Sequence, residues 1–160
     1  MTQEDKKLLL TDLCARLPYG VKCCIYNFGE DTVRIKEDVL WSVQGDNILT
    51  LKSYVEKGEA YMYHQIKPYL SPISSMTEEQ ERELLDLTGY KSECTAYCGF
   101  DSMGYYIKNV GEFEYEEGEH SFIFYPDYIG LDWFNKNHFD YRGLIEKGLA
   151  IDATGLNIYC

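Results

Sequence analysis

Short segments of alternating apolar residues, several of them separated by glycine-containing turns, fill the chain between residues 21 and 63. Alternation with a period of two is typical of a strand that buries one face. The sequence Gly45-Asp46-Asn47 favours a tight turn between antiparallel neighbours. We therefore expect three or four strands arranged as a meander. The segments of this meander lie at residues 21–28, 32–35, 39–43 and 48–51, and residues 60–63 are a candidate for an additional strand.

Two helices are indicated by capping boxes, in which a threonine caps the first turn and a residue three positions later reaches back. Thr2 and Asp5 precede leucines at helical spacing, and Thr77 and Gln80 precede a second such run. Acidic residues after Thr77 suit the positive end of a helix. The sequence predicts helices over residues 3–16 and 78–88.

The remaining segments are predicted from turn residues and local periodicity. The proline-rich segment 67–72 should be irregular, because each proline restricts the residue before it. Asp127 should cap a short third helix that ends at His138, where an imidazole suits the negative helix end. We expect a loop over 90–103, strands at 105–110, 113–116 and 121–125, and a last strand within 141–151.

Length and composition indicate one folded domain over residues 1–160. Hydrophobic residues make up 45% of the chain and aromatic residues 15%, which is enough for a packed core. The fold class expected is α+β, with an antiparallel sheet of meander and hairpins. About three helices should form a single layer on that sheet.

The charge balance narrows the classes of partner. The chain has 27 acidic and 15 basic residues, a formal net charge of -12. Such a surface repels phosphate backbones and anionic lipid, so we expect neither direct nucleic-acid binding nor membrane binding. One alternative stays open, because an acidic surface can imitate nucleic acid toward a basic protein.

The first residues do not match a secretory signal, since Leu8-Leu9-Leu10 is much shorter than a signal peptide's apolar region. We therefore expect a cytoplasmic protein. Reduced thiols are then favoured over three disulfides. The six cysteines are Cys14, Cys23, Cys24, Cys94, Cys98 and Cys160.

Motifs for nucleotide, zinc-protease and serine-hydrolase chemistry are absent from the sequence, and we predict no cofactor and no metal. Cys94, Cys98 and His120 would need a fourth zinc ligand, for example Cys23 or His138, and lack the paired spacing of zinc ribbons.

A second enzymatic possibility is a hydrolase with an unrecognised site near His138. Cys98, His138 and Asp140 could form a nucleophile, a base and an orienting group. Spacing along the sequence says nothing about their geometry, and a triad is recognised by geometry. We therefore leave the enzyme question open, with a non-enzymatic protein favoured.

Two segments are candidates for an interaction surface. Glu112, Glu114 and Glu116 would share one face of a strand, which is either a solvated face or an acidic contact for a basic partner. The segment 132–143 is either a helix end that buries its aromatic residues or an exposed cluster typical of interface hot spots. Its candidate residues are Trp133, His138, Phe139, Tyr141 and Arg142.

Two stretches, Lys67-Pro68-Tyr69-Leu70-Ser71-Pro72-Ile73-Ser74-Ser75-Met76-Thr77-Glu78-Glu79 and His138-Phe139-Asp140-Tyr141-Arg142-Gly143-Leu144-Ile145, carry a resemblance. They resemble a family of small uncharacterised proteins from prophages and mobile elements of Bacteroides-type gut bacteria. The two stretches make up 21 of the 160 residues. It implies a bacterial or phage cytoplasmic context, and no activity, cofactor or catalytic residue.

The function favoured by these observations is protein interaction, as an accessory or host-modulating factor of a mobile element. The 15 tyrosines support it, because tyrosine supplies amphipathic contact area at low entropic cost. The alternatives are the hydrolase near His138 and the acidic nucleic-acid mimic. The oligomeric state is left open.

Overall fold

The structure is a computed structural model, and its described parts form two compact units. Unit 1 comprises residues 1–71 and 143–160, and unit 2 comprises Pro72–Arg142. The prediction of one domain over 1–160 stays a prediction. For residues 95–101, 104–112 and 119–124, and for Lys36 and Ile48, only the backbone is described. The described residues are 1–26, 36–44, 48–52, 60–88, 95–101, 104–112, 119–124 and 128–159.

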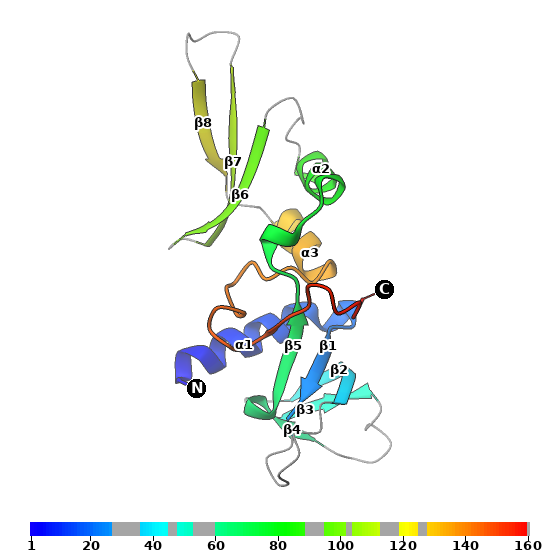
Figure 1. Ribbon diagram of the computed structural model, residues 1–160. Helices are drawn as coiled ribbons and strands as arrows, with labels where there is room; N and C mark the ends of the chain where they lie inside the picture. The colour runs from blue at the N-terminus through cyan, green and yellow to red at the C-terminus, as the bar shows by residue number, and fades with distance from the viewer. Residues whose placement is uncertain are drawn as a thin grey trace. The chain divides into compact units, whose positions relative to one another are not determined.

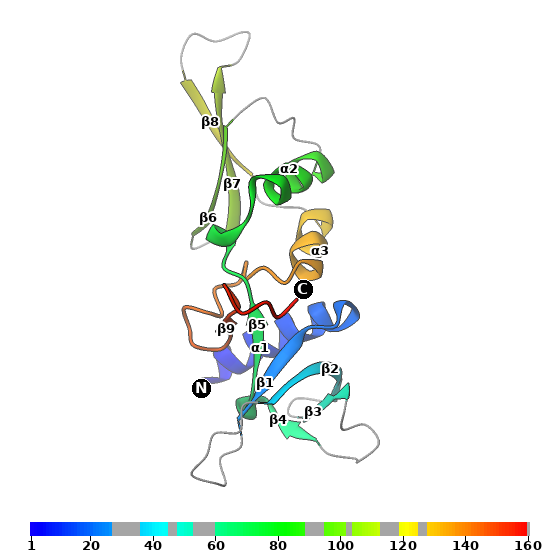
Figure 2. The same ribbon diagram turned by 45° about the vertical axis from the view of Figure 1, so that its right-hand side comes forward.

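Unit 1 contains a six-stranded sheet in the order β4-β3-β2-β1-β5-β9, of which Figure 1 labels β1 to β5. Successive strands β1 to β4 pair antiparallel, as the predicted meander requires. Only β5 and β9 pair in parallel among these strands, side by side in Figure 2. The elements are α1 (Gln3–Arg16), η1 (Leu17–Tyr19), β1 (Lys22–Ile25), β2 (Lys36–Gln44), β3 (Ile48–Leu51), β4 (Tyr61–Met62), η3 (Tyr63–Gln65), β5 (Ile66–Leu70) and β9 (Ile151–Asp152).

Helix α1 has the bounds predicted from its capping box. The Asp5 N–H donates to Thr2 Oγ1, and the Thr2 N–H donates to Asp5 Oδ2, both at 3.0 Å. The bond from the Thr2 N–H stabilises the carboxylate and lowers the pKa of Asp5. The helix ends before Pro18, and Gly20 completes the exit with a φ of 66°.

The two faces of the sheet are covered by different segments. Leu9 and Leu13 of α1 pack on one face, against Cys23 and Ile25 of β1. Cys24 points to the other face, because successive strand residues alternate. There it joins a second cluster, formed with residues that the C-terminal segment supplies. That cluster contains Cys24, Tyr69, Ala153 and Ile158.

The prediction that residues 67–72 are irregular is wrong for most of that segment, because β5 runs through Pro68. The Tyr26 N–H donates to the Gln65 carbonyl, and the register places Pro68 opposite Cys23. Hydrogen-bonded and non-hydrogen-bonded pairs alternate along an antiparallel ladder, so Pro68 occupies a non-hydrogen-bonded position. The missing N–H therefore removes no bond to β1.

The predicted last strand within 141–151 is also mostly wrong, since only Ile151 and Asp152 form β9. Turns precede that strand, and Gly148 has a φ of 67°. The Leu149 N–H donates to the Leu144 carbonyl at 2.8 Å across the turn. Leu144 and Leu149 are buried on the α1 side of the sheet.

Gly148→Ala should therefore destabilise the protein by about 1–2 kcal/mol, because an L-residue is strained at a left-handed φ. No atom lies within 4 Å of the position that the added Cβ would occupy, so a steric clash does not contribute. Chemical denaturation measures the change. Glu146→Ala, at an exposed site in the same turn, is the control and should stay within about 0.5 kcal/mol. Equal stability of the two variants would contradict the prediction.

Unit 2 contains two helices and a three-stranded antiparallel sheet in the order β6-β7-β8. The Thr77–Gln80 capping box is confirmed, with α2 as predicted to within one residue. The loop prediction is wrong at 95–101, because all seven residues of β6 pair with β7. The elements are η4 (Ile73–Ser75), α2 (Glu78–Leu87), β6 (Thr95–Asp101), β7 (Gly104–Glu112), β8 (Glu119–Phe124) and α3 (Tyr128–Lys136).

The predicted fold class is confirmed: the protein is α+β, and its described residues form mostly antiparallel strands and three α-helices. Strands predicted at 105–110 and 121–125 correspond to β7 and β8. The segments predicted as strands at 32–35 and 113–116, and the cap at Asp127, lie outside the described residues.

Candidate functional site

The turn after α3 holds the predicted candidates of segment 132–143. The His138 N–H donates to the Asn135 carbonyl, and the Phe139 N–H donates to the Phe134 carbonyl. These two bonds define a Schellman motif, in which the residue after the C-cap is left-handed. His138 occupies that position with a φ of 57°, where glycine is the usual residue. The helix itself ends at Lys136, two residues before the predicted end.

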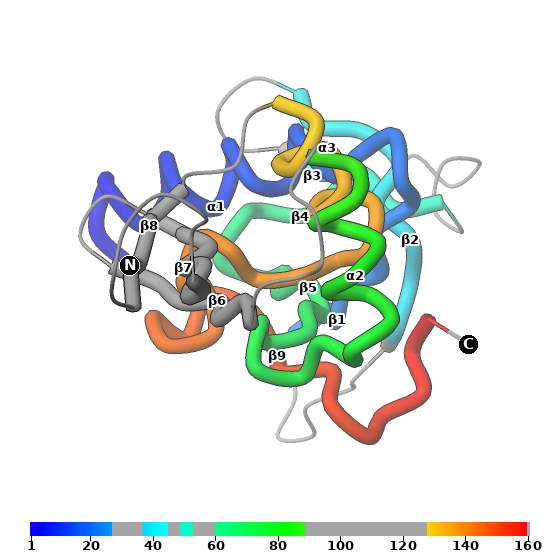
Figure 3. The backbone as a smooth tube through the Cα atoms, turned by 90° about the horizontal axis from the view of Figure 1, so that it is seen from above, coloured from blue at the N-terminus to red at the C-terminus, as the bar shows by residue number. Residues whose placement is uncertain are grey.

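The aromatic residues of this segment are packed in the core of unit 2. Trp133 and Phe139 stack with their ring centroids 5.6 Å apart, and Phe134 meets both edge-on. Leu84 and Leu85 of α2 complete the cluster, so α2 and α3 lie side by side (Figure 3). The Tyr141 hydroxyl donates to Asn135 Oδ1 at 3.1 Å.

Of the two readings of this segment, its burial favours the helix end that buries its aromatic residues. Trp133, Phe139 and Tyr141 are 6% exposed or less, so a partner could not reach them in the folded protein. Arg142 is half-buried, with its guanidinium 4.3 Å from the Tyr141 ring centroid. The role of these residues in binding stays a prediction.

His138 is also buried, with 6% of its surface exposed. Asp140, its predicted orienting partner, is buried two residues later. The third residue of the possible triad, Cys98, lies in β6, where only the backbone is described. Hydrolytic chemistry at His138 therefore stays a prediction, and the burial of the imidazole counts against it.

The register of the three-stranded sheet separates two of the possible zinc ligands. Cys98 pairs with Ile107, whereas His120 pairs with Gly111, four residues further along β7. At about 3.4 Å per residue, the two pairs lie about 14 Å apart along the strand. Cys98 and His120 are too far apart to bind one zinc ion. Across the described side chains, no group of three potential metal ligands is found.

The acidic candidates lie at the end of the β7–β8 pair. The register places Glu112 directly opposite Glu119. Like charges at opposed positions destabilise an antiparallel pair. The sequence between them contains three further glutamates, of which Glu114 and Glu116 were candidates; both lie outside the described residues.

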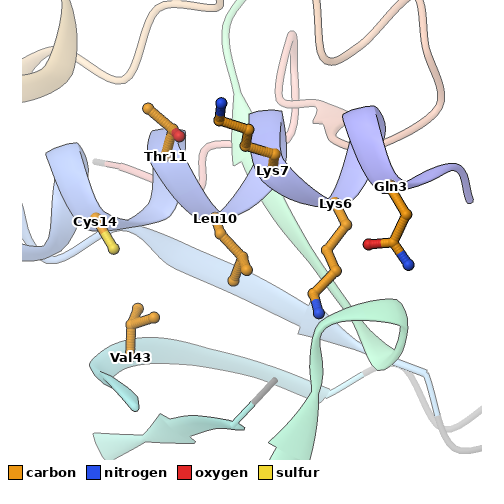
Figure 4. Close-up of a pocket in the computed structure, with 7 residues that line it drawn as sticks. All are labelled: Gln3, Lys6, Lys7, Leu10, Thr11, Cys14 and Val43. Atoms are coloured by element: carbon orange, nitrogen blue, oxygen red, sulfur yellow. The ribbon is translucent and has the colours of Figure 1, made fainter. Parts of the chain in front are cut away.

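A site that the sequence did not indicate is a groove on α1, in unit 1. Its volume is about 530 Å³, within the range of binding pockets. Figure 4 shows Leu10 and Cys14 directed toward Val43 of β2, with Lys6 extending on the same side. We call this site the α1 groove. Its lining residues are Gln3, Lys6, Lys7, Leu10, Thr11, Cys14 and Val43.

The helical part of the groove lining could have been recognised from the spacing of its residues in the sequence. Gln3, Lys7, Leu10 and Cys14 follow the i, i+4, i+7, i+11 spacing of one helical stripe. Val43 has no such signal, because a β-bulge in β2 decides which way it points. The register shifts between Leu40 and Ser42, so Leu40 and Val43 both pack in the α1-side core.

The described cysteines are free, and they differ in their exposure to solvent. Cys14 is exposed, whereas Cys23 and Cys24 are buried. Burial, reinforced by the charge of Asp12, raises the pKa of the Cys23 thiol. Cys23 is therefore held as an unreactive thiol at neutral pH.

Comparisons with protein-family models, with curated proteins and with solved structures found no match for this chain. None of the helices in the described part of the chain combines the length and the apolarity needed to cross a bilayer.

Proposed function

We propose that the protein is a protein-interaction factor whose acidic β7–β8 hairpin contacts a basic partner. The observation that carries the proposal is the register that sets Glu112 opposite Glu119. Opposed like charges cost folding stability, and a fold tolerates such a cost most readily where binding gains from it.

The chain as a whole supports this proposal. Its net charge of -12 raises the association rate with a basic protein and discourages association with nucleic acid or anionic lipid. The resemblance to prophage and mobile-element proteins adds a cytoplasmic, host-modulating role to the proposal. A partner that itself binds nucleic acid would make the hairpin a mimic of phosphate backbone.

The double variant Glu112→Gln, Glu119→Gln tests the hairpin. It should be more stable than the wild type by about 0.5 kcal/mol, because the opposed charges are gone. It should capture about fivefold less of the partner, since each ion pair that the two carboxylates make with a basic partner is worth about 0.5 kcal/mol. Capture by tagged protein from extracts of Bacteroides-type bacteria, followed by quantitative mass spectrometry, measures the second effect.

Glu79→Gln with Glu83→Gln is the matched control, because it neutralises two exposed carboxylates one turn apart on α2. If the hairpin variant and the α2 control variant captured the partner equally well, the hairpin would not be the surface that contacts the partner. Competition by duplex DNA, fading as salt rises, would identify the partner's nucleic-acid site as the target.

A further inference from the structure

The α1 groove is basic in a strongly acidic chain. Two of its seven described lining residues are lysines and none is a carboxylate, although acidic residues outnumber basic ones 27 to 15. Charges farther away than the Debye length of about 8 Å are largely screened at physiological salt. Glu4 and Asp5 lie on the same helix but do not line the groove, so the described charged groups that border a ligand seated in it are Lys6 and Lys7.

The lysines border an apolar floor. Leu10 and Val43 are half-buried and pack on the unit-1 core, so each leaves part of its surface in the groove. The Lys6 ammonium lies 4.9 Å from the Tyr63 ring centroid, which orders that side chain at the groove's edge. Lys7 and Thr11 project from the upper edge of the helix in Figure 4.

We propose that the α1 groove binds an acidic peptide segment of a partner protein. An aliphatic side chain of the peptide rests on Leu10 and Val43, and its carboxylates lie near Lys6 and Lys7. A second copy of this chain packing helix to helix is disfavoured, because it would bring two pairs of lysines together. The site is independent of the acidic hairpin and has the opposite charge.

Three fluorescein-labelled peptides separate the contributions of charge and of apolar contact. DELLDE should bind the full chain, whereas DESSDE lacks the aliphatic anchor and KKLLKK reverses the charge. Fluorescence anisotropy should show at least about tenfold weaker binding for both control peptides, equivalent to about 1.4 kcal/mol. Equal binding of DELLDE and DESSDE, or tighter binding of KKLLKK, would overturn the proposal.

Protein variants locate the site. Lys6→Gln with Lys7→Gln should weaken DELLDE binding about tenfold at low salt, as expected for two partly exposed ion pairs. Lys52→Gln with Lys136→Gln makes the same charge change at exposed positions outside the groove and should leave binding unchanged. Lys7→Gln alone keeps the contact between Lys6 and Tyr63, so this single variant replaces the double variant in the binding assay if the double variant is unstable.

Cys14 supplies a readout that does not depend on charge. It is exposed and lines the groove, so bound DELLDE should slow its alkylation by N-ethylmaleimide. Mass spectrometry of the tryptic peptide 8–16 follows this thiol alone. An unchanged alkylation rate at saturating peptide would place the peptide elsewhere. Self-association that requires Lys6 and Lys7, seen by sedimentation, would make a second copy the occupant and refute the proposed partner.

Discussion

Asp12→Ala is expected to lower the free energy of unfolding by about 3–5 kcal/mol, because it leaves the Arg16 charge buried without this partner. Both side chains are fully buried in α1, with 0% of each exposed. Arg16 Nε donates to Asp12 Oδ2 at 2.7 Å, and a terminal guanidinium nitrogen donates to Oδ1 at 3.0 Å. Denaturant titration measures the loss.

A double variant distinguishes the cost of an orphaned charge from the loss of packing. Asp12→Leu with Arg16→Met replaces the pair by apolar side chains and should recover most of the stability, since buried ion pairs exchange for apolar residues at little cost. Thr11→Ala, at the adjacent exposed position, should change stability by less than about 0.5 kcal/mol. An Asp12→Ala variant as stable as Thr11→Ala would show that the pair is solvated.

Phe134→Ala is expected to destabilise unit 2 by about 3–5 kcal/mol, the usual range for removing a fully buried phenylalanine. Phe134 has no exposed surface and contacts the rings of Trp133, Phe139 and Tyr141. Tyr128→Ala on the same helix is the control, because Tyr128 is 79% exposed.

This variant also tests the one-domain prediction, because the chain has an internal reporter in each unit. In a Trp41→Phe background, Trp133 is the remaining tryptophan and reports on unit 2. Alkylation of buried Cys23 and Cys24 reports on unit 1. Under the one-domain prediction, both reporters shift to the same lower midpoint in Phe134→Ala. A shift confined to Trp133 would refute it.

The sequence did not predict that the C-terminal segment packs on the sheet and hydrogen-bonds to it, because its partners there are far away along the chain. The Tyr159 hydroxyl accepts a bond from the Lys22 N–H and donates to the Tyr69 carbonyl, at 3.1 and 2.8 Å. Burial raises the pKa of Tyr159, so its hydroxyl stays protonated and able to donate. These partners are 137 and 90 residues away along the chain, beyond any local pattern.

The candidate sites also combine features that were visible in the sequence with features that only the fold revealed. The acidic segment around Glu112 was evident from the sequence, but its pairing with Glu119 required the register of β7 and β8. The aromatic residues around His138 were also evident, yet a local pattern could not decide between an exposed cluster and a core. The α1 groove went unnoticed because Val43 joins it only through the fold.

By itself the sequence determined the features that depend on residues within four or five positions of one another. These are the capping boxes at Thr2 and Thr77 and the two helices that follow them. Only the tertiary structure decided that Pro68 lies in a strand, that Asp12 and Arg16 are buried, and which aromatic residues form a core. Those outcomes depend on which distant segments pair and exclude water, and the free energy of such contacts has no counterpart in local periodicity.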